Sequence, residues 1–231
     1  MDYWTPSHDR DLAPRDAAGW MFLREAIKNS RSTGAVAPSG RRLARLLADP
    51  VRAEGGPVDV LEVGAGTGSV TRTLLARLGS GSRLDIVEAN PRFAQRLERL
   101  IGAHPAARRA RLYEEFIEDY RPAHHYDVIV SGLPFTNFTP AQVHTIMGRY
   151  LTMLRPGGTL TYFTYLGTGA ARGIVASRAE VERHRSVEGV LAAYQRRYGT
   201  GCRTVWGNLP PAHVWRLRGA AHPLVLTGAN R

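Results

Sequence analysis

The chain has 231 residues, 43% of them hydrophobic, which is enough for one domain with a sizeable buried core. Its formal net charge is +11, and this excess favours polyanionic partners, either nucleic acid or anionic lipid, unless an arginine bias of genomic origin explains it. A single cysteine, Cys202, excludes an intrachain disulfide framework and favours a reducing compartment. No apolar run approaches the roughly 20 residues of a membrane span, and the charged start predicts no signal peptide.

The first fifty residues predict a helical extension. Residues 16–28 place Trp20, Leu23 and Ile27 on one helical face, with Phe22 beside it and charged residues opposite. A helix of this kind either lies in a membrane surface or packs its apolar face on the domain. A turn-rich stretch at 29–39 and a second helix near 39–49 follow it.

Residues 51–231 alternate short apolar strands with helices, a pattern that predicts βαβ units and a parallel sheet. The expected strands are 58–63, 83–89, 110–113, 126–133 and 156–165, and the expected helices are 68–78, 91–102 and 140–154. After an arginine-rich helix at 173–197, two strands at 203–207 and 213–219 predict an antiparallel hairpin. The predicted fold class is α/β: a Rossmann-like, seven-stranded, mostly parallel sheet with a C-terminal antiparallel hairpin.

A glycine-rich turn follows the first strand. Gly64, Gly66 and Gly68 allow a tight turn and close approach of a ligand to the backbone. Glu62 precedes them, and Glu88 ends the next strand, where an acid can accept hydrogen bonds from a ribose. The third glycine stands one position too early for a dinucleotide fingerprint, and the spacing instead resembles that of class I methyltransferases. Their donor, S-adenosylmethionine, carries an ammonium group that Glu62 can bind, and no pyrophosphate.

This resemblance implies a fold and a donor site. The fold would be that of a class I methyltransferase, with residues 29–39 capping the donor and no metal involved. Glu115 and Phe116 follow the third strand, where this class places an acid near the adenine, although a solvated helix start is the alternative. The complete set of expected donor-binding residues is Ser32, Thr33, Gly34, Glu62, Gly64, Gly66, Thr67, Gly68, Glu88, Ala89, Glu115, Phe116 and Ser131.

The end of the fourth strand, at 131–135, bears on the acceptor. The rRNA adenine dimethylases carry an asparagine where this chain has Gly132, which weakens that comparison. The chain resembles more closely the bacterial phospholipid N-methyltransferases, in segments 29–39, 61–68, 131–135, 157–158 with 163–165, and 206–215. That family usually has arginine where this chain has His213. The resemblance implies stepwise methylation of phosphatidylethanolamine to phosphatidylcholine, with S-adenosyl-L-homocysteine as the other product.

The headgroup amine must lose a proton before it attacks, and its methylated product is a cation that aromatic rings attract. The candidates for the proton acceptor are the backbone around Ser131 and Leu133, the hydroxyl of Tyr165, and His144. The expected substrate-binding residues are Arg31, Phe135, Tyr165, Asn208, His213 and Trp215, with Tyr162, Trp206 and Arg216 as further candidates.

The same resemblance implies an enzyme bound peripherally to the inner face of the cytoplasmic membrane, in contact with anionic phospholipid and not with nucleic acid. The expected membrane anchors are Trp4, Trp20, Phe22, Leu23 and Ile27. Two alternatives stay open: an RNA adenine N6-methyltransferase, which predicts a helical C-terminal domain, and a catalytically idle lipid-binding module.

Overall fold

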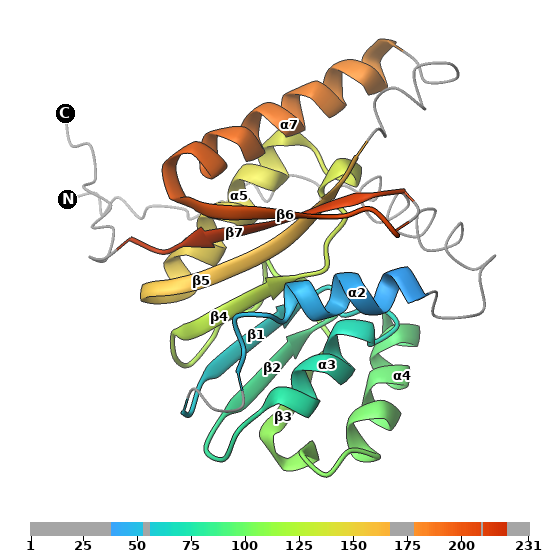
Figure 1. Cartoon of the computed structure of the whole chain (residues 1–231), viewed down its shortest axis with the longest axis vertical. Coiled ribbons are helices and arrows are strands. Elements are labelled where there is room, and N and C mark those ends of the chain that lie inside the picture. The colour runs from blue at the N-terminus through green and yellow to red at the C-terminus, as the bar shows by residue number, and fades with distance from the viewer. Residues whose placement is uncertain (1–37, 53–55, 167–177, 209, 221–231) are drawn as a thin grey trace, which may run out of the picture.

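A computed structural model of the chain describes residues 38–52, 56–166, 178–208 and 210–220. Seven strands form one sheet in the order β3-β2-β1-β4-β5-β7-β6 (Figure 1). The first five strands are parallel, whereas β7 runs antiparallel to both β5 and β6. Their bounds are β1 Asp59–Val63, β2 Arg83–Val87, β3 Ala110–Tyr113, β4 Tyr126–Ser131, β5 Leu154–Tyr165, β6 Gly199–Val205 and β7 Ala212–Arg218.

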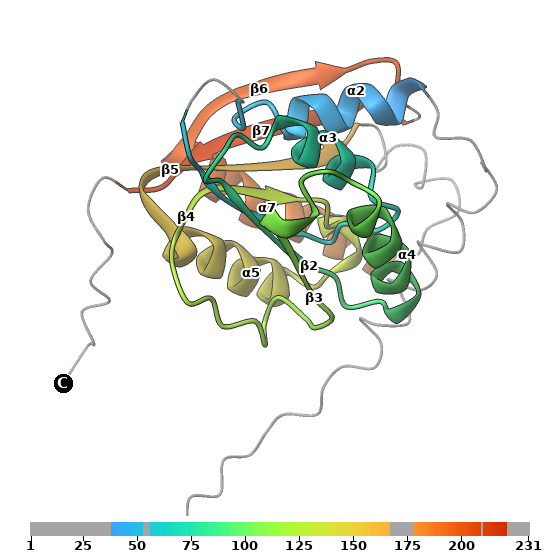
Figure 2. The ribbon, with the colours of Figure 1, turned by 90° about the horizontal axis from the view of Figure 1, so that it is seen from below.

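Helices cover both faces of the sheet (Figures 1 and 2). One face carries α2 (Pro38–Leu47), α3 (Ser69–Arg77) and α4 (Pro91–Gly102). The other carries α5 (Pro140–Met153) and α7 (Arg178–Tyr198). Two short 3-10 turns, Ala107–Arg109 and Phe135–Asn137, complete the described elements.

Local sequence signals explain where the elements begin. All five residues of β1 are buried, as expected for a central parallel strand covered on both faces. The Asn90 side chain accepts a hydrogen bond from the amide of Arg92, and Pro91 fits the first turn of α4 because its missing N–H has no partner there. Thr139 and Gln142 form a capping box at the start of α5.

Apolar side chains divide into two core clusters, one on each face. Leu74 of α3 and Leu97 of α4 belong to the cluster between the first face and its helices. Tyr150 of α5 and Tyr162 of β5 belong to the cluster on the second face. Each fully buried side chain of this size contributes roughly 1.5–3 kcal/mol. Leu47, Ala48 and Val51 belong to the first cluster, so the segment that ends the predicted extension at residue 50 packs into the same core as the sheet.

The predicted fold class is confirmed: a seven-stranded mixed sheet with a C-terminal antiparallel hairpin. Among the described residues, no helix combines the length and the apolarity that crossing a bilayer requires. The predicted interfacial helix at 16–28, with all five expected membrane anchors, lies outside the described residues, as do Arg31, Ser32, Thr33 and Gly34.

Candidate active site

The strand order reverses between β1 and β4, which makes their carboxyl ends the place where open α/β sheets bind ligands. Val63 ends β1 and stands in register with Val87 of β2 and Ser131 of β4. The loop after β1 is tied to both neighbours: Gly64 N–H donates to the Val87 carbonyl at 2.9 Å, and Gly132 N–H donates to the Val63 carbonyl at 2.8 Å. The glycine loop therefore lies at the centre of this edge.

Two glycines of the loop have different tasks. Gly64, Gly66 and Gly68 all have positive φ, at 71°, 54° and 82°. A Cβ on Gly64 would lie 2.6 Å from Cδ2 of Leu133, so packing against the β4 end excludes a side chain there. A Cβ on Gly66 would meet nothing within 4 Å. The space beside Gly66 is open, as a loop that lets a ligand approach its backbone requires.

Glu62 has a buried carboxyl group that could bind a cation. Only 1% of the residue is exposed, and neither carboxylate oxygen has a hydrogen-bond partner among the described residues. Burial raises the pKa of Glu62 to about 8, and the negative charge of Glu88 adds to the rise. An unpartnered buried carboxylate is costly, and the ammonium of S-adenosylmethionine would satisfy it. The residue therefore fits the role predicted for it.

Glu88 stabilises the glycine loop through hydrogen bonds. One of its carboxylate oxygens accepts a hydrogen bond from Gly66 N–H at 2.8 Å, and the other accepts one from Asn90 N–H at 2.9 Å. Burial raises its pKa, and these two amides oppose the rise. Each carboxylate oxygen can accept a second hydrogen bond, which leaves capacity for the ribose hydroxyls predicted to bind here.

The β4 end is held by contacts that the sequence did not indicate. A Cβ on Gly132 would lie 2.5 Å from the Gly64 carbonyl, so glycine is needed where the two strand ends meet. The hydroxyl of Tyr150 donates to Ser131 Oγ at 3.1 Å, and Leu133 N–H donates to the same atom at 3.4 Å. Ser131 is fully buried, so its side chain fixes the strand end. The signal for Gly132 was its departure from the adenine dimethylase pattern; a helical tyrosine such as Tyr150 gives none.

The remaining described donor residues lie along the same edge. Thr67 stands in the glycine loop and Ala89 follows Glu88, both half-buried. Glu115 is half-buried and Phe116 is 45% exposed, just after β3. Their positions at strand ends agree with the sequence-based expectation, and their contacts to a donor remain predictions.

Two expected substrate-binding residues are buried and have partners within the protein, and their contact with a substrate stays a prediction. Phe135 is 1% exposed and packs edge-on against Tyr162 at 5.5 Å, so its ring is part of the core. Asn208 is 7% exposed, and its amide donates to the Pro210 carbonyl at 2.8 Å, so it holds the turn between β6 and β7. The sequence motif did not indicate these contacts, because side-chain direction depends on packing between segments.

His144 and Arg216 also have other partners. His144 is exposed on α5, with Nδ1 3.2 Å from the Tyr194 hydroxyl of α7, so the structure places it on the seam between these helices. Arg216 forms an ion pair with Asp49 at 2.8 Å, on the sheet face that α2 covers. Neither residue is brought to the glycine loop.

Three expected substrate-binding residues remain near the strand ends. Tyr165 ends β5, and burial raises the pKa of its hydroxyl. His213 stands opposite Thr164, with its Nδ1 3.0 Å from Thr204 Oγ1, and its ring meets Trp215 at 6.1 Å. Tyr165 lies on the α2 face, whereas His213 and Trp215 lie on the α7 face. The predicted set is thus divided between the two faces of β5 and β7.

Comparison with known proteins agrees with this geometry. Residues 60–158 match the family described as methyltransferase domain. The fold and this match are those of class I S-adenosylmethionine-dependent methyltransferases, and the comparisons support S-adenosylmethionine as the cofactor.

Relatives refine this assignment. An ornithine lipid N-methyltransferase of Singulisphaera acidiphila is 28% identical over 153 residues, which cover 63% of this chain and 77% of that protein. The N-methyltransferase NodS of Bradyrhizobium japonicum, solved with S-adenosyl-L-homocysteine, superposes with a TM-score of 0.62 at 18% identity, covering 84% of this chain and 97% of NodS. The 1,6-didemethyltoxoflavin-N1-methyltransferase of Burkholderia thailandensis gives 0.63 at 17% identity, covering 95% and 93%. The two structures share the fold with this chain.

Proposed function

We propose that this enzyme methylates the headgroup amine of phosphatidylethanolamine, and then its mono- and dimethyl derivatives, to give phosphatidylcholine. The reaction would take place on the cytoplasmic face of the cytoplasmic membrane. The observation that carries the proposal is the similarity to a lipid N-methyltransferase over most of that protein's length. The resemblance of segments 29–39 and 206–215 to phospholipid N-methyltransferases directs it to phosphatidylethanolamine.

The residues at the strand ends suit a reaction that needs positioning above all. The bound donor supplies an activated methyl group on its sulfonium. Glu62 is available for the ammonium of the donor, Glu88 and Gly66 hold the loop, and the backbone from Ser131 to Leu133 borders the place expected for the amine.

A headgroup ammonium titrates near ~10, as lysine does, so it must give up a proton. Because burial raises the pKa of Tyr165, its hydroxyl stays protonated at neutral pH and serves as a hydrogen-bond acceptor, not as a base. Ser131 Oγ already accepts two hydrogen bonds. The proton therefore passes to water before the amine attacks, and backbone carbonyls around residues 131–133 can then orient the neutral amine by accepting hydrogen bonds from its remaining N–H groups.

Two other acceptors deserve a direct comparison. Ornithine lipid is the acceptor named for the relative, so it is the second candidate. RNA is less favoured, because the described residues after β5 form one helix and a hairpin where the RNA alternative predicts a helical domain.

The decisive experiment offers S-adenosylmethionine with a labelled methyl group to the purified protein, with separate acceptors in parallel. These are vesicles of phosphatidylethanolamine with phosphatidylglycerol, vesicles of ornithine lipid with phosphatidylglycerol, and bulk rRNA. We expect label in lipids that migrate as methylated phosphatidylethanolamine. Label confined to ornithine lipid would replace the substrate, and label in RNA would overturn the lipid assignment.

A further inference from the structure

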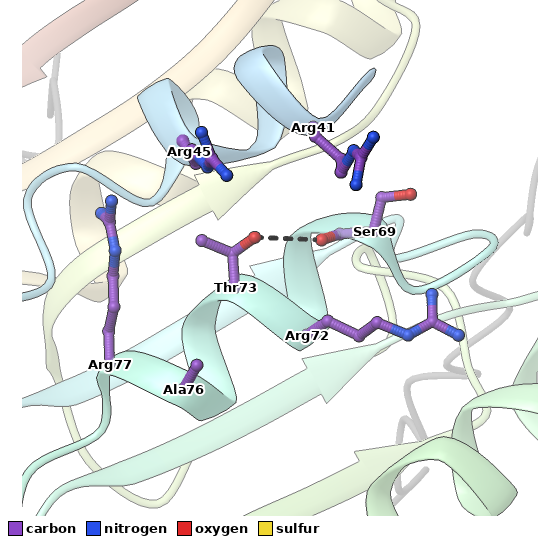
Figure 3. A pocket seen from close by; sticks show the side chains of 7 residues that line it. All are labelled: Arg41, Arg45, Ser69, Arg72, Thr73, Ala76 and Arg77. Carbon is purple, nitrogen blue, oxygen red and sulfur yellow. Dashed lines mark hydrogen bonds between the residues drawn. The ribbon is translucent and has the colours of Figure 1, made fainter. Parts of the chain in front are cut away.

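A groove rich in arginine runs between α2 and α3 (Figure 3). Its volume is about 490 Å³. Arg41 and Arg45 reach it from α2, and the side of α3 that faces α2 contributes the remaining lining residues: Ser69, Arg72, Thr73, Ala76 and Arg77. Four of the seven lining residues are arginines and none is acidic.

Three of these arginines have no acidic partner among the described residues. Within the described ranges, Arg41, Arg45 and Arg72 form no ion pair or side-chain hydrogen bond, and all three are exposed. Arg77 differs, because its guanidinium donates to the Ala48 carbonyl at 2.5 Å and so holds the chain just beyond α2.

At the opposite edge of the sheet, by contrast, arginines are paired with aspartates. There Arg83 pairs with Asp59 at 2.7 Å, and Arg155 pairs with both Asp59 and Asp127. Arginines that line one groove without carboxylates create a positive potential there, so the α2–α3 groove favours an anion from outside.

The groove opens beside the donor loop. Ser69 directly follows Gly68, the last glycine of that loop, and lies at the Arg41 end of the groove (Figure 3). From there the lining follows α3 for two turns to Arg77. An anionic group in the groove would therefore sit on the surface next to the methyl donor.

We infer that this groove binds the phosphate of a membrane phospholipid. Guanidinium groups pair with phosphate oxygens through two parallel hydrogen bonds, and the hydroxyl of Ser69 can add a further donor. The volume exceeds that of a phosphate group, which leaves space for the glycerol of a headgroup. The lipid source of the phosphate rests on the proposed function, whereas the preference of the groove for phosphate rests on its arginines alone.

The test compares the full chain with the double variant Arg45→Gln, Arg72→Gln. Binding is measured by co-sedimentation with vesicles of phosphatidylcholine containing rising fractions of phosphatidylglycerol. Because each arginine near an anionic membrane strengthens binding several-fold, we expect roughly a tenfold or greater loss in the partition coefficient on phosphatidylglycerol-rich vesicles. Binding to pure phosphatidylcholine vesicles should fall less, because the choline of that lipid neutralises the charge of its phosphate.

The matched control is Arg185→Gln, Arg196→Gln, which removes the same charge from exposed positions on α7, across the sheet. It should retain most of the binding. Calorimetry with S-adenosylmethionine and with inorganic phosphate, thermal melting, and filter binding to bulk RNA complete the comparison. Intact folding and donor affinity in the α2–α3 variant would assign the loss to the membrane contact.

Several outcomes would overturn the inference. Equal vesicle binding by wild type and the α2–α3 variant would show that lipid does not use the groove. Loss of inorganic phosphate binding alone would make it a site for free phosphate, and loss of RNA binding alone would assign it to nucleic acid. Loss of donor affinity would make the arginines part of the donor site. None of these readouts requires turnover, so they stand whether or not phosphatidylethanolamine is methylated.

Discussion

Glu62 is the residue whose chemistry the site constrains most. With a pKa of about 8 in the donor-free protein, it is mostly protonated at pH 7. An ammonium group beside it favours the ionised form. Donor binding at pH 7 should therefore release close to one proton, because the pKa of Glu62 lies about one unit above that pH and most of the carboxyl groups are protonated before the donor binds. Calorimetric titration with S-adenosylmethionine in buffers of different ionisation enthalpy measures this release. Glu62→Gln should abolish it and weaken donor binding roughly tenfold or more, because a charged hydrogen bond is lost.

The same carboxylate sets a pH dependence of stability. Its pKa is raised from 4.5 in the unfolded chain to about 8 in the folded protein, so the folded state holds the proton more tightly. The contribution of Glu62 is therefore fully favourable below pH 4.5 and is lost as pH rises to 8. Donor-free Glu62→Gln should melt at a higher temperature than wild type at pH 8.5, and the gap should narrow towards pH 5. A constant gap would mean that Glu62 does not titrate in this window.

Gly66 offers a separate test of the donor loop. Gly66→Asp should remove donor binding, because its side chain would enter the open space that the ligand needs. Folding should survive, since aspartate tolerates the left-handed φ of 54° at this position. Gly157→Asp is the matched control: φ is 74°, a Cβ there also meets nothing within 4 Å, and the residue lies near the start of β5, at the opposite edge. Normal donor affinity in the Gly66 variant, measured by calorimetry, would refute the assignment of the loop.

Helices and strands were predictable wherever the sequence is strongly patterned. The expected helix at 91–102 has the observed bounds, because a proline start and apolar periodicity mark it. The expected strand at 110–113 also has the observed bounds, although its sequence pattern is weaker. The glycine-rich turn after the first strand was predictable too, since its glycines and acids are adjacent in sequence or follow adjacent strands. The burial of Phe135 and the α2–α3 groove were not predictable, because they depend on contacts between segments far apart in the chain.

The N-terminal helix predicted at 16–28 lies outside the described residues and can be tested by deletion. Its apolar face and basic flank favour a surface-bound helix that contributes to membrane affinity and does not bind the donor. Removal of residues 1–28 should therefore lower vesicle pelleting several-fold while donor affinity, measured by calorimetry, stays within about twofold. Unchanged pelleting would mean that this helix packs on the domain instead.

The whole molecule presents one edge of its sheet as the candidate membrane face. β6 is parallel to β5, since both pair antiparallel with β7, so the ends of β5 and β6 lie on the same edge as the glycine loop. Trp206 follows β6 directly and is 75% exposed. A tryptophan at such a tip is suited to the membrane interface, where its ring is apolar and its N–H remains hydrated. An edge that carries both the donor loop and this ring would bring lipid amines to the methyl group.

Trp206→Ala should therefore lower binding to phosphatidylethanolamine and phosphatidylglycerol vesicles by roughly tenfold, the equivalent of burying one large side chain. The melting temperature and donor affinity should hardly change, because so exposed a side chain contributes little to the core. Trp206→Phe should recover much of the binding, since it keeps a large apolar ring at the tip. If vesicle co-sedimentation is the same for all three proteins, this edge does not face the bilayer, and the lipid must reach the donor from another side of the sheet.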